Sequence, residues 1–172
     1  MAESTKKTII LGIDPGLAST GFGVIEQEGG SLKCLDYGTI STKAGGQLGI
    51  RLKEISEKLC QVIDKYEISV AAVEEIYFCK NVKSALAVGQ AKGAVLLSCS
   101  NCGLPVYEYT PLQIKQAITG YGKADKNQIQ QMVKILLRLK AVPHPDHAAD
   151  ALAVAICCAH SQKHENTKTQ KH

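Results

Sequence analysis

Apolar residues near the start of the chain follow the pattern of strands. Thr8–Asp14 is a mainly apolar run that ends in a carboxylate, which is typical of a buried central strand. Two more strands are expected, from Gly21 to Glu26 and from about Leu32 to Ser41. Gly29-Gly30 between them is a hairpin signal. The pattern therefore predicts three consecutive strands with antiparallel pairing.

The apolar period then lengthens to three or four residues. It recurs at Leu48, Leu52, Ile55, Leu59, Val62 and Ile63, which indicates an amphipathic helix. Val70–Val73, followed by Glu74, predicts another buried strand that ends in a carboxylate. A helix rich in small residues is expected from Val82 to Cys102, with Gly103 as its C-cap. A fifth strand follows from Leu104 to Tyr109.

The last third of the chain is predicted to be helical. Thr110-Pro111 has the pattern of an N-cap followed by proline at the first helical position, and this helix should reach about Ile118. Asp125 is expected to cap a helix that continues through Leu137, and a final helix should run from roughly Asp146 to His160. The order predicts an α/β fold with one mixed five-stranded sheet flanked by helices. Residues 1–160 would form one domain, and the polar residues 161–172 a disordered tail.

Composition and charge narrow the class of protein. A chain of 172 residues with 45% hydrophobic residues can bury one sizeable core. Apolar runs such as Ala94–Leu97 are too short for a bilayer, and no signal peptide is visible, which predicts a cytoplasmic protein. Seven cysteines, an odd number, favour reduced thiols over a disulfide framework. Residues 75–160 carry 9 Lys/Arg against 5 Asp/Glu, which is compatible with a phosphate-backbone partner.

The candidate chemistry lies at the ends of predicted elements. Asp14 and Glu74 each end a central strand, and carboxylates at adjacent strand ends repel each other unless a proton or a cation lies between them. His147 and Asp150 are three residues apart, so they project from one face of the last helix. Oxygen-rich sites with one imidazole suit Mg²⁺ or Mn²⁺, and a cluster that holds two ions suits in-line phosphodiester cleavage.

Each of these residues also has a purely structural interpretation. Asp14 before Pro-Gly could cap a turn. Glu74 could be a surface residue, and Glu75 is an equally available carboxylate. Asp146 is expected to be the N-cap of the last helix, and His147 alone could be a hydrogen-bonded structural histidine. Three carboxylates at strand, strand and helix termini in this order are much harder to explain by structure alone.

Four motifs together resemble the RuvC family of crossover junction endodeoxyribonucleases. They are Gly12-Ile-Asp-Pro-Gly-Leu-Ala-Ser-Thr-Gly-Phe-Gly, Val73-Glu-Glu-Ile-Tyr-Phe, Asn81-Val-Lys-Ser-Ala-Leu-Ala-Val-Gly-Gln-Ala-Lys-Gly and Asp146-His-Ala-Ala-Asp-Ala-Leu-Ala. The first motif alone occurs in related folds, the second and third are specific at this spacing, and the fourth fixes the assignment. The resemblance covers about Thr8 to His160.

The resemblance implies a ribonuclease H-like fold and a homodimer that nicks two strands of like polarity at four-way (Holliday) junctions, in homologous recombination and DNA repair. The products would carry 5′-phosphate and 3′-hydroxyl ends, and cutting would favour a short T-containing sequence. Asp14, Glu74, His147 and Asp150 match the family's metal-binding quartet. The resemblance implies two Mg²⁺ ions per subunit, with Mn²⁺ as a substitute. It also makes a branch-migration helicase of the RuvA and RuvB type an expected partner.

The resemblance also implies that three further residues bind DNA. Tyr77 occupies a position where an aromatic ring can stack on an unpaired base, although a half-buried ring is the alternative. Lys115 and Lys126 match basic positions near the scissile phosphate, and each could instead be a solvated helix charge. The helix from Val82 resembles the family's dimer interface, with packing on the sheet as the alternative. Cys79 departs from the small residue expected at its position in the loop.

Three other functions compete with junction cleavage. Another ribonuclease H-like nuclease that processes RNA would share the first motif, but the helix from Asn81 and the turn from His147 to Asp150 argue against it. An ATP-binding phosphotransferase of the actin and sugar-kinase type needs a duplicated second half, which 172 residues cannot supply. A protein that binds junctions without cutting them would not need the complete quartet.

Overall fold

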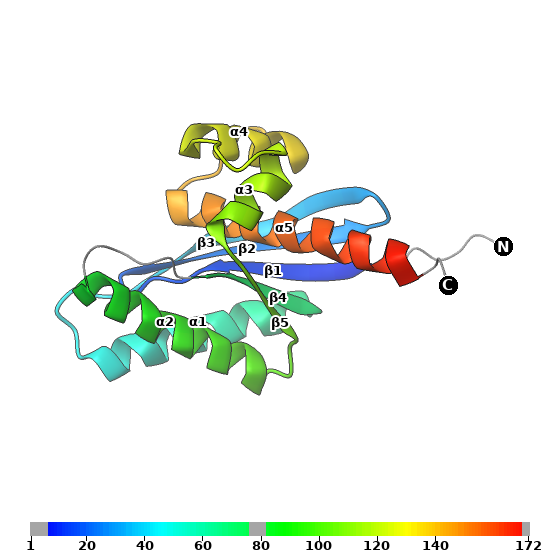
Figure 1. Cartoon of the computed structure of the whole chain (residues 1–172). Helices are drawn as coiled ribbons and strands as arrows, with labels where there is room; N and C mark the ends of the chain where they lie inside the picture. The colour runs from blue at the N-terminus through cyan, green and yellow to red at the C-terminus, as the bar shows by residue number, and fades with distance from the viewer. Residues whose placement is uncertain (1–6, 76–81, 170–172) are drawn as a thin grey trace.

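A five-stranded mixed sheet in the order β3-β2-β1-β4-β5 lies at the centre of the protein (Figure 1). The computed structural model describes residues 7–75 and 82–169, with side chains up to residue 162. The strands are β1 (Thr8–Asp14), β2 (Ser19–Glu28), β3 (Ser31–Ser41), β4 (Val70–Glu74) and β5 (Val106–Tyr109). β1, β2 and β3 pair antiparallel, whereas β4 is parallel to both β1 and β5. The predicted mixed α/β sheet is confirmed.

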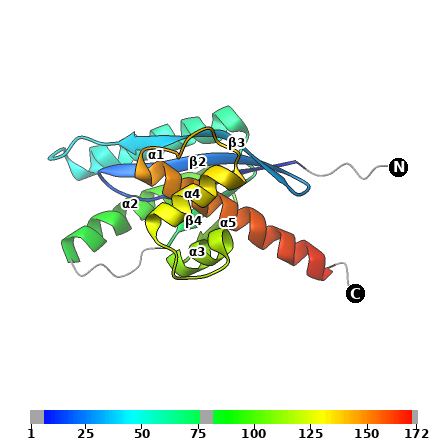
Figure 2. The same ribbon diagram turned by 90° about the horizontal axis from the view of Figure 1, so that it is seen from above.

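Helices cover both faces of the sheet (Figures 1 and 2). α1 (Leu48–Tyr66) and α2 (Val82–Asn101) cover one face, and α5 (Asp146–Thr169) lies on the other. α3 (Pro111–Thr119) and α4 (Lys126–Leu136) pack on the outer side of α5. Thr110 and Asp125 begin α3 and α4 with capping boxes, so both predicted N-caps are confirmed.

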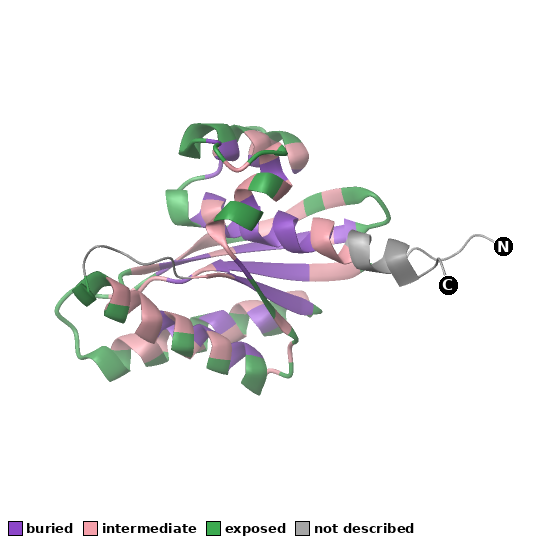
Figure 3. Ribbon diagram, in the orientation of Figure 1, coloured by how far each residue is buried: buried purple, intermediate pink, exposed green. Residues whose placement is uncertain are grey.

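The sheet separates two hydrophobic cores, because successive side chains of a strand point to opposite faces. On β1, Ile10 belongs to the core under α5, and Leu11 and Ile13 belong to the core under α1 and α2. All three side chains are fully buried. Figure 3 shows this burial along the middle of the sheet and along α5. A central strand covered on both faces accounts for the unbroken apolar run in the sequence.

Helix α5 is longer than the sequence predicted. It continues to Thr169, whereas the apolar pattern predicted an end near His160. The residues from Ser161 onward include no glycine or proline, and several of them, such as lysine, glutamine and glutamate, have good helix propensity. The helix therefore continues where the apolar face has ended. The division into a domain of residues 1–160 and a tail of residues 161–172 stays a prediction.

Buried cysteines contribute to both cores. Burial raises the pKa of Cys99 and of Cys157 to about 12, so both remain protonated thiols at neutral pH. Cys79 lies outside the described residues. In the described part of the chain, no helix is both long and apolar enough to cross a bilayer.

Glycines on the sheet allow α5 to lie directly against it. A Cβ atom at Gly12 would lie 2.0 Å from the carbonyl oxygen of Ala151, and one at Gly21 would lie 1.9 Å from the carbonyl oxygen of His147. Gly21 is the register partner of Asp14. The first turn of α5 therefore reaches the end of β1 because no side chain separates them.

Gly21→Ala is expected to lower the free energy of unfolding by about 3 kcal/mol, because the added methyl group forces α5 and the sheet apart. Gly49→Ala is the matched control, since a Cβ at this position in α1 meets nothing within 4 Å. The control should raise stability by about 0.5–1 kcal/mol through helix propensity. Urea denaturation of both variants measures the difference. Equal stability of the two variants would contradict the close approach of α5.

Candidate metal centre

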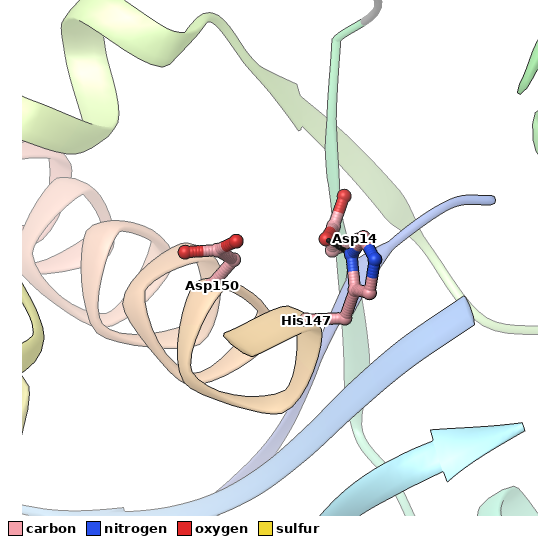
Figure 4. A group of neighbouring side chains, drawn as sticks. All are labelled: Asp14, His147 and Asp150. Carbon is pink, nitrogen blue, oxygen red and sulfur yellow. Dashed lines mark hydrogen bonds and ion pairs between the residues drawn. The ribbon is translucent and has the colours of Figure 1, made fainter. Parts of the chain in front are cut away.

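Two parallel strands bring two carboxylates to the same edge of the sheet. Asp14 is the last residue of β1, and Glu74 is the last residue of β4. Ile13 and Val73 are the last paired residues of these strands, so the two carboxylates follow side by side. The N-terminal end of α5 lies beside this edge and adds His147 and Asp150 (Figure 4).

Three of the four side chains converge closely. One oxygen from Asp14, one oxygen from Asp150 and one ring nitrogen of His147 all lie within 4.8 Å of one another. Nδ1 of His147 is 2.7 Å from Oδ2 of Asp14. Asp14 is 15% exposed and His147 51%, so the cluster opens toward solvent on the histidine side. The spacing and the open side leave access for a cation.

Glu74 has the most perturbed ionisation in the cluster. Burial, the negative charges of Asp14 and Asp150, and a hydrogen bond with Asp14 together raise its pKa to about 8. The positive charge of Lys126 offsets only part of this effect. Burial also raises the pKa of Asp150. Without a cation, Glu74 therefore keeps a proton at neutral pH.

These residues fit a hard divalent cation. The cluster offers carboxylate oxygens and one imidazole, the set that suits Mg²⁺ or Mn²⁺ rather than a softer metal. The repulsion that adds to burial in keeping Glu74 protonated would be relieved by positive charge in the same place. The prediction that these side chains lie close together is confirmed for Asp14, His147 and Asp150. Glu74 interacts with the charges of Asp14 and Asp150.

A cavity of about 240 Å³ lies next to this cluster. Its lining residues are Glu74, Pro111, Ile114, Lys115, Ala124, Asp125, Lys126, Ile129, Asp150 and Ala153. Two predicted basic residues and two predicted ligands thus face one space. Glu75 is not among the lining residues; its backbone N–H donates to the carbonyl of Tyr109 at 2.9 Å. The structure therefore favours Glu74 over Glu75. Tyr77 lies outside the described residues.

Asp146 does not have the predicted N-cap position. It is the first residue of α5, and the carbonyl of Pro145 before it accepts bonds from the N–H groups of Ala148 and Ala149. The carboxylate of Asp146 points to α4 instead and accepts from Lys126 at 2.9 Å and from Gln130 at 3.1 Å. These contacts lower the pKa of Asp146. The N-cap prediction was wrong because tertiary partners on α4 outcompete the helix's own N–H groups.

The sequence did not reveal what holds the turn after Asp14. Arg51 of α1 donates through Nη2 to the carbonyl of Leu17 at 3.2 Å and through Nε to Oγ1 of Thr42 at 2.8 Å. The buried Thr20 hydroxyl donates to the carbonyl of Gly16 at 2.8 Å. Gly16, Leu17 and Thr20 belong to the first motif, whereas Arg51 and Thr42 lie outside the recognised motifs. The Arg51 contact joins residues far apart in the sequence, which periodicity cannot detect.

Comparison with known proteins agrees with the geometry. The family model for "Crossover junction endodeoxyribonuclease RuvC" matches residues 10–158. The protein of that name from Clostridioides difficile (strain 630) is 52% identical over 159 residues, which is 92% of this chain and 94% of the relative. The protein of that name from Treponema pallidum (strain Nichols) is 56% identical over 158 residues, or 90% and 81% of the two chains.

Solved structures show the same fold. Thermus thermophilus RuvC in complex with a Holliday junction substrate superposes with a TM-score of 0.88 and 35% identity, covering 92% of this chain and 96% of the other. The yeast mitochondrial Holliday junction resolvase Ydc2 has a TM-score of 0.64 at 13% identity, covering 98% and 88%. The second likeness concerns the fold alone.

Proposed function

Because this chain belongs to the RuvC family of crossover junction endodeoxyribonucleases, it is a DNA endonuclease, and we propose that it resolves four-way (Holliday) junctions by paired symmetric nicks in homologous recombination and DNA repair. The observation that carries the proposal is the convergence of Asp14, His147 and Asp150 within 4.8 Å at the edge of the sheet. A site that only bound junctions would not need ionisable ligands at this spacing.

We assign metal binding to Asp14, Glu74, His147 and Asp150. When bound, two Mg²⁺ ions, for which Mn²⁺ can substitute, supply the positive charge that activates a water nucleophile and stabilises the leaving oxygen. Asp14 contacts both Glu74 and His147, so it would be the ligand best placed to bind both ions. Bound cations would favour the deprotonated form of Glu74, which can act as a ligand.

The cavity beside the cluster supports the assignment of DNA contacts. Lys115 and Lys126 line it together with Glu74 and Asp150, so their ammonium groups can neutralise a phosphate presented to the metal site. Tyr77 is proposed to stack on a base unpaired at the junction. The products would carry 5′-phosphate and 3′-hydroxyl ends.

A homodimer would place two such sites on one junction. Helix α2 exposes apolar side chains: Val82 is 80% exposed, Leu86 62% and Leu97 63%. Exposed apolar side chains on one helix are typical of an interface. We propose that a second copy packs on α2, that the dimer acts in the cytoplasm, and that a branch-migration helicase of the RuvA and RuvB type is its partner.

The test is a nicking assay with a synthetic four-way junction, compared with duplex DNA of the same sequence. The proposal requires two symmetric nicks in the junction, dependence on Mg²⁺ or Mn²⁺, and inhibition by EDTA. Analytical ultracentrifugation of the free protein tests the homodimer. Junction binding without nicking in Mg²⁺ or Mn²⁺ would identify a binding protein instead.

His147→Ala is expected to lose most of the cleavage activity, because an imidazole that can bind the metal is removed. His147→Asp should keep substantial activity, since a carboxylate replaces the ligand. Partial rescue of the alanine variant by Mn²⁺ is also expected, because Mn²⁺ tolerates a depleted site better. Single-turnover rates on a junction in each metal provide the measurement. Wild-type rates for His147→Ala would make the histidine structural.

A further inference from the structure

Asp146 is not one of the proposed metal ligands, and its side chain contacts α4 instead. Oδ2 of Asp146 lies 2.9 Å from Nζ of Lys126, and its Oδ1 accepts a hydrogen bond from Nε2 of Gln130 at 3.1 Å. Both partners belong to α4. The same ammonium group lies 3.5 Å from Oδ2 of Asp150. One lysine is thus shared between a carboxylate assigned to the metal and one that is not, and it is closer to the second.

This sharing bears on metal binding, because an ammonium group and a divalent cation repel each other and compete for the same carboxylate. Lys126 and Asp150 line one cavity. An ammonium group centred on Asp150 would occupy a place that a cation needs. Asp146 offers a second carboxylate on the outer side, with its other oxygen fixed by Gln130.

We propose that Asp146 is a positioning residue that draws the ammonium group of Lys126 away from Asp150, which leaves Asp150 available to the metal ion and holds the lysine at the cavity where a phosphate enters. The inference rests on the proposed metal site. It assigns to Asp146 an effect that acts only through Lys126.

A purely structural role for Asp146 would have a different signature. Asp146 joins the start of α5 to α4, so its loss could simply loosen the two helices. The two helices, however, also share an apolar core that contains Ile129 and Val133 of α4 and Leu152 of α5. With Asp146 and Lys126 both about half exposed, the ion pair is a minor part of that contact.

The experiment measures Mn²⁺ binding to the metal-free full-length protein without DNA, by isothermal titration calorimetry and by the EPR signal of free Mn²⁺. Six proteins are compared: wild type, Asp146→Asn, Asp146→Ser, Lys126→Met, the double variant of Asp146→Asn with Lys126→Met, and Asp14→Asn as the control for the metal site. Asp146→Asn should bind Mn²⁺ about three- to fivefold more weakly, a change within the range of an exposed ion pair. Lys126→Met should bind at least as tightly as wild type, and the double variant should match Lys126→Met.

Two results would overturn the proposal. One is unchanged Mn²⁺ affinity in both Asp146→Asn and Asp146→Ser. The other is an equal loss with and without Lys126, which would mean that Asp146 acts on the cation directly or through the fold. Thermal unfolding of each variant identifies a folding effect. Failure of wild-type protein to bind Mn²⁺, or normal binding by Asp14→Asn, would instead contradict the metal site and with it the proposed function.

Discussion

Replacing Asp14 with Asn is expected to reduce junction cleavage by on the order of 10³-fold or more, while junction binding stays intact or improves. Loss of one group that stabilises charge in the transition state commonly costs 10²–10³ in rate. Asp14 also contacts His147 and shares a hydrogen bond with Glu74, so its loss disturbs the whole cluster. Binding should survive because removal of one negative charge reduces repulsion of the phosphates.

Single-turnover nicking and electrophoretic mobility shifts on the same four-way junction separate the two effects. Glu75→Gln is the matched control, because it removes a carboxylate next to Glu74 that does not line the cavity. The control should cut at nearly the wild-type rate. Turnover by Asp14→Asn above a few per cent of wild type would remove Asp14 from the metal site.

The sequence predicts the parts of this fold in which local pattern and burial agree. β1 and β4 are covered on both faces, so their buried residues form continuous apolar runs that end at Asp14 and Glu74. The caps at Thr110 and Asp125 depend on residues three positions away, which local sequence contains. The meeting of the carboxylates could be predicted for the same reason, because parallel strand ends share an edge.

Features that depend on tertiary partners could not be predicted. Asp146 has the residue type of an N-cap, and only the approach of Lys126 and Gln130 from α4 gives it another role. The glycine at position 21 is in the recognised motif, but its closeness to the carbonyl of His147 emerges only when α5 is placed on the sheet. Arg51 has no local signal at all, because its partner Leu17 is distant in sequence.

The proton on Glu74 links the stability of the metal-free protein to pH. The ordinary pKa of this side chain is 4.5, and in the folded protein it is about 8. Between these values the unfolded chain has lost the proton and the folded chain keeps it. The folded state therefore binds more protons in this window, so the free energy of unfolding falls as pH rises from about 4.5 through 8.

Glu74→Gln is expected to remove this part of the pH dependence, because an amide does not ionise and can still donate a hydrogen bond to Asp14. In EDTA, the wild type should lose on the order of 3 kcal/mol between pH 5 and pH 9 relative to the variant. Urea denaturation at several pH values, with both proteins in EDTA, measures this difference. Addition of Mg²⁺ at pH 8 should stabilise the wild type more than the variant, since the cation replaces the proton at Glu74. If the free energy of unfolding depended on pH in the same way for both proteins, Glu74 would be ionised at neutral pH. The repulsion among the three carboxylates would then be too weak to favour a cation between them.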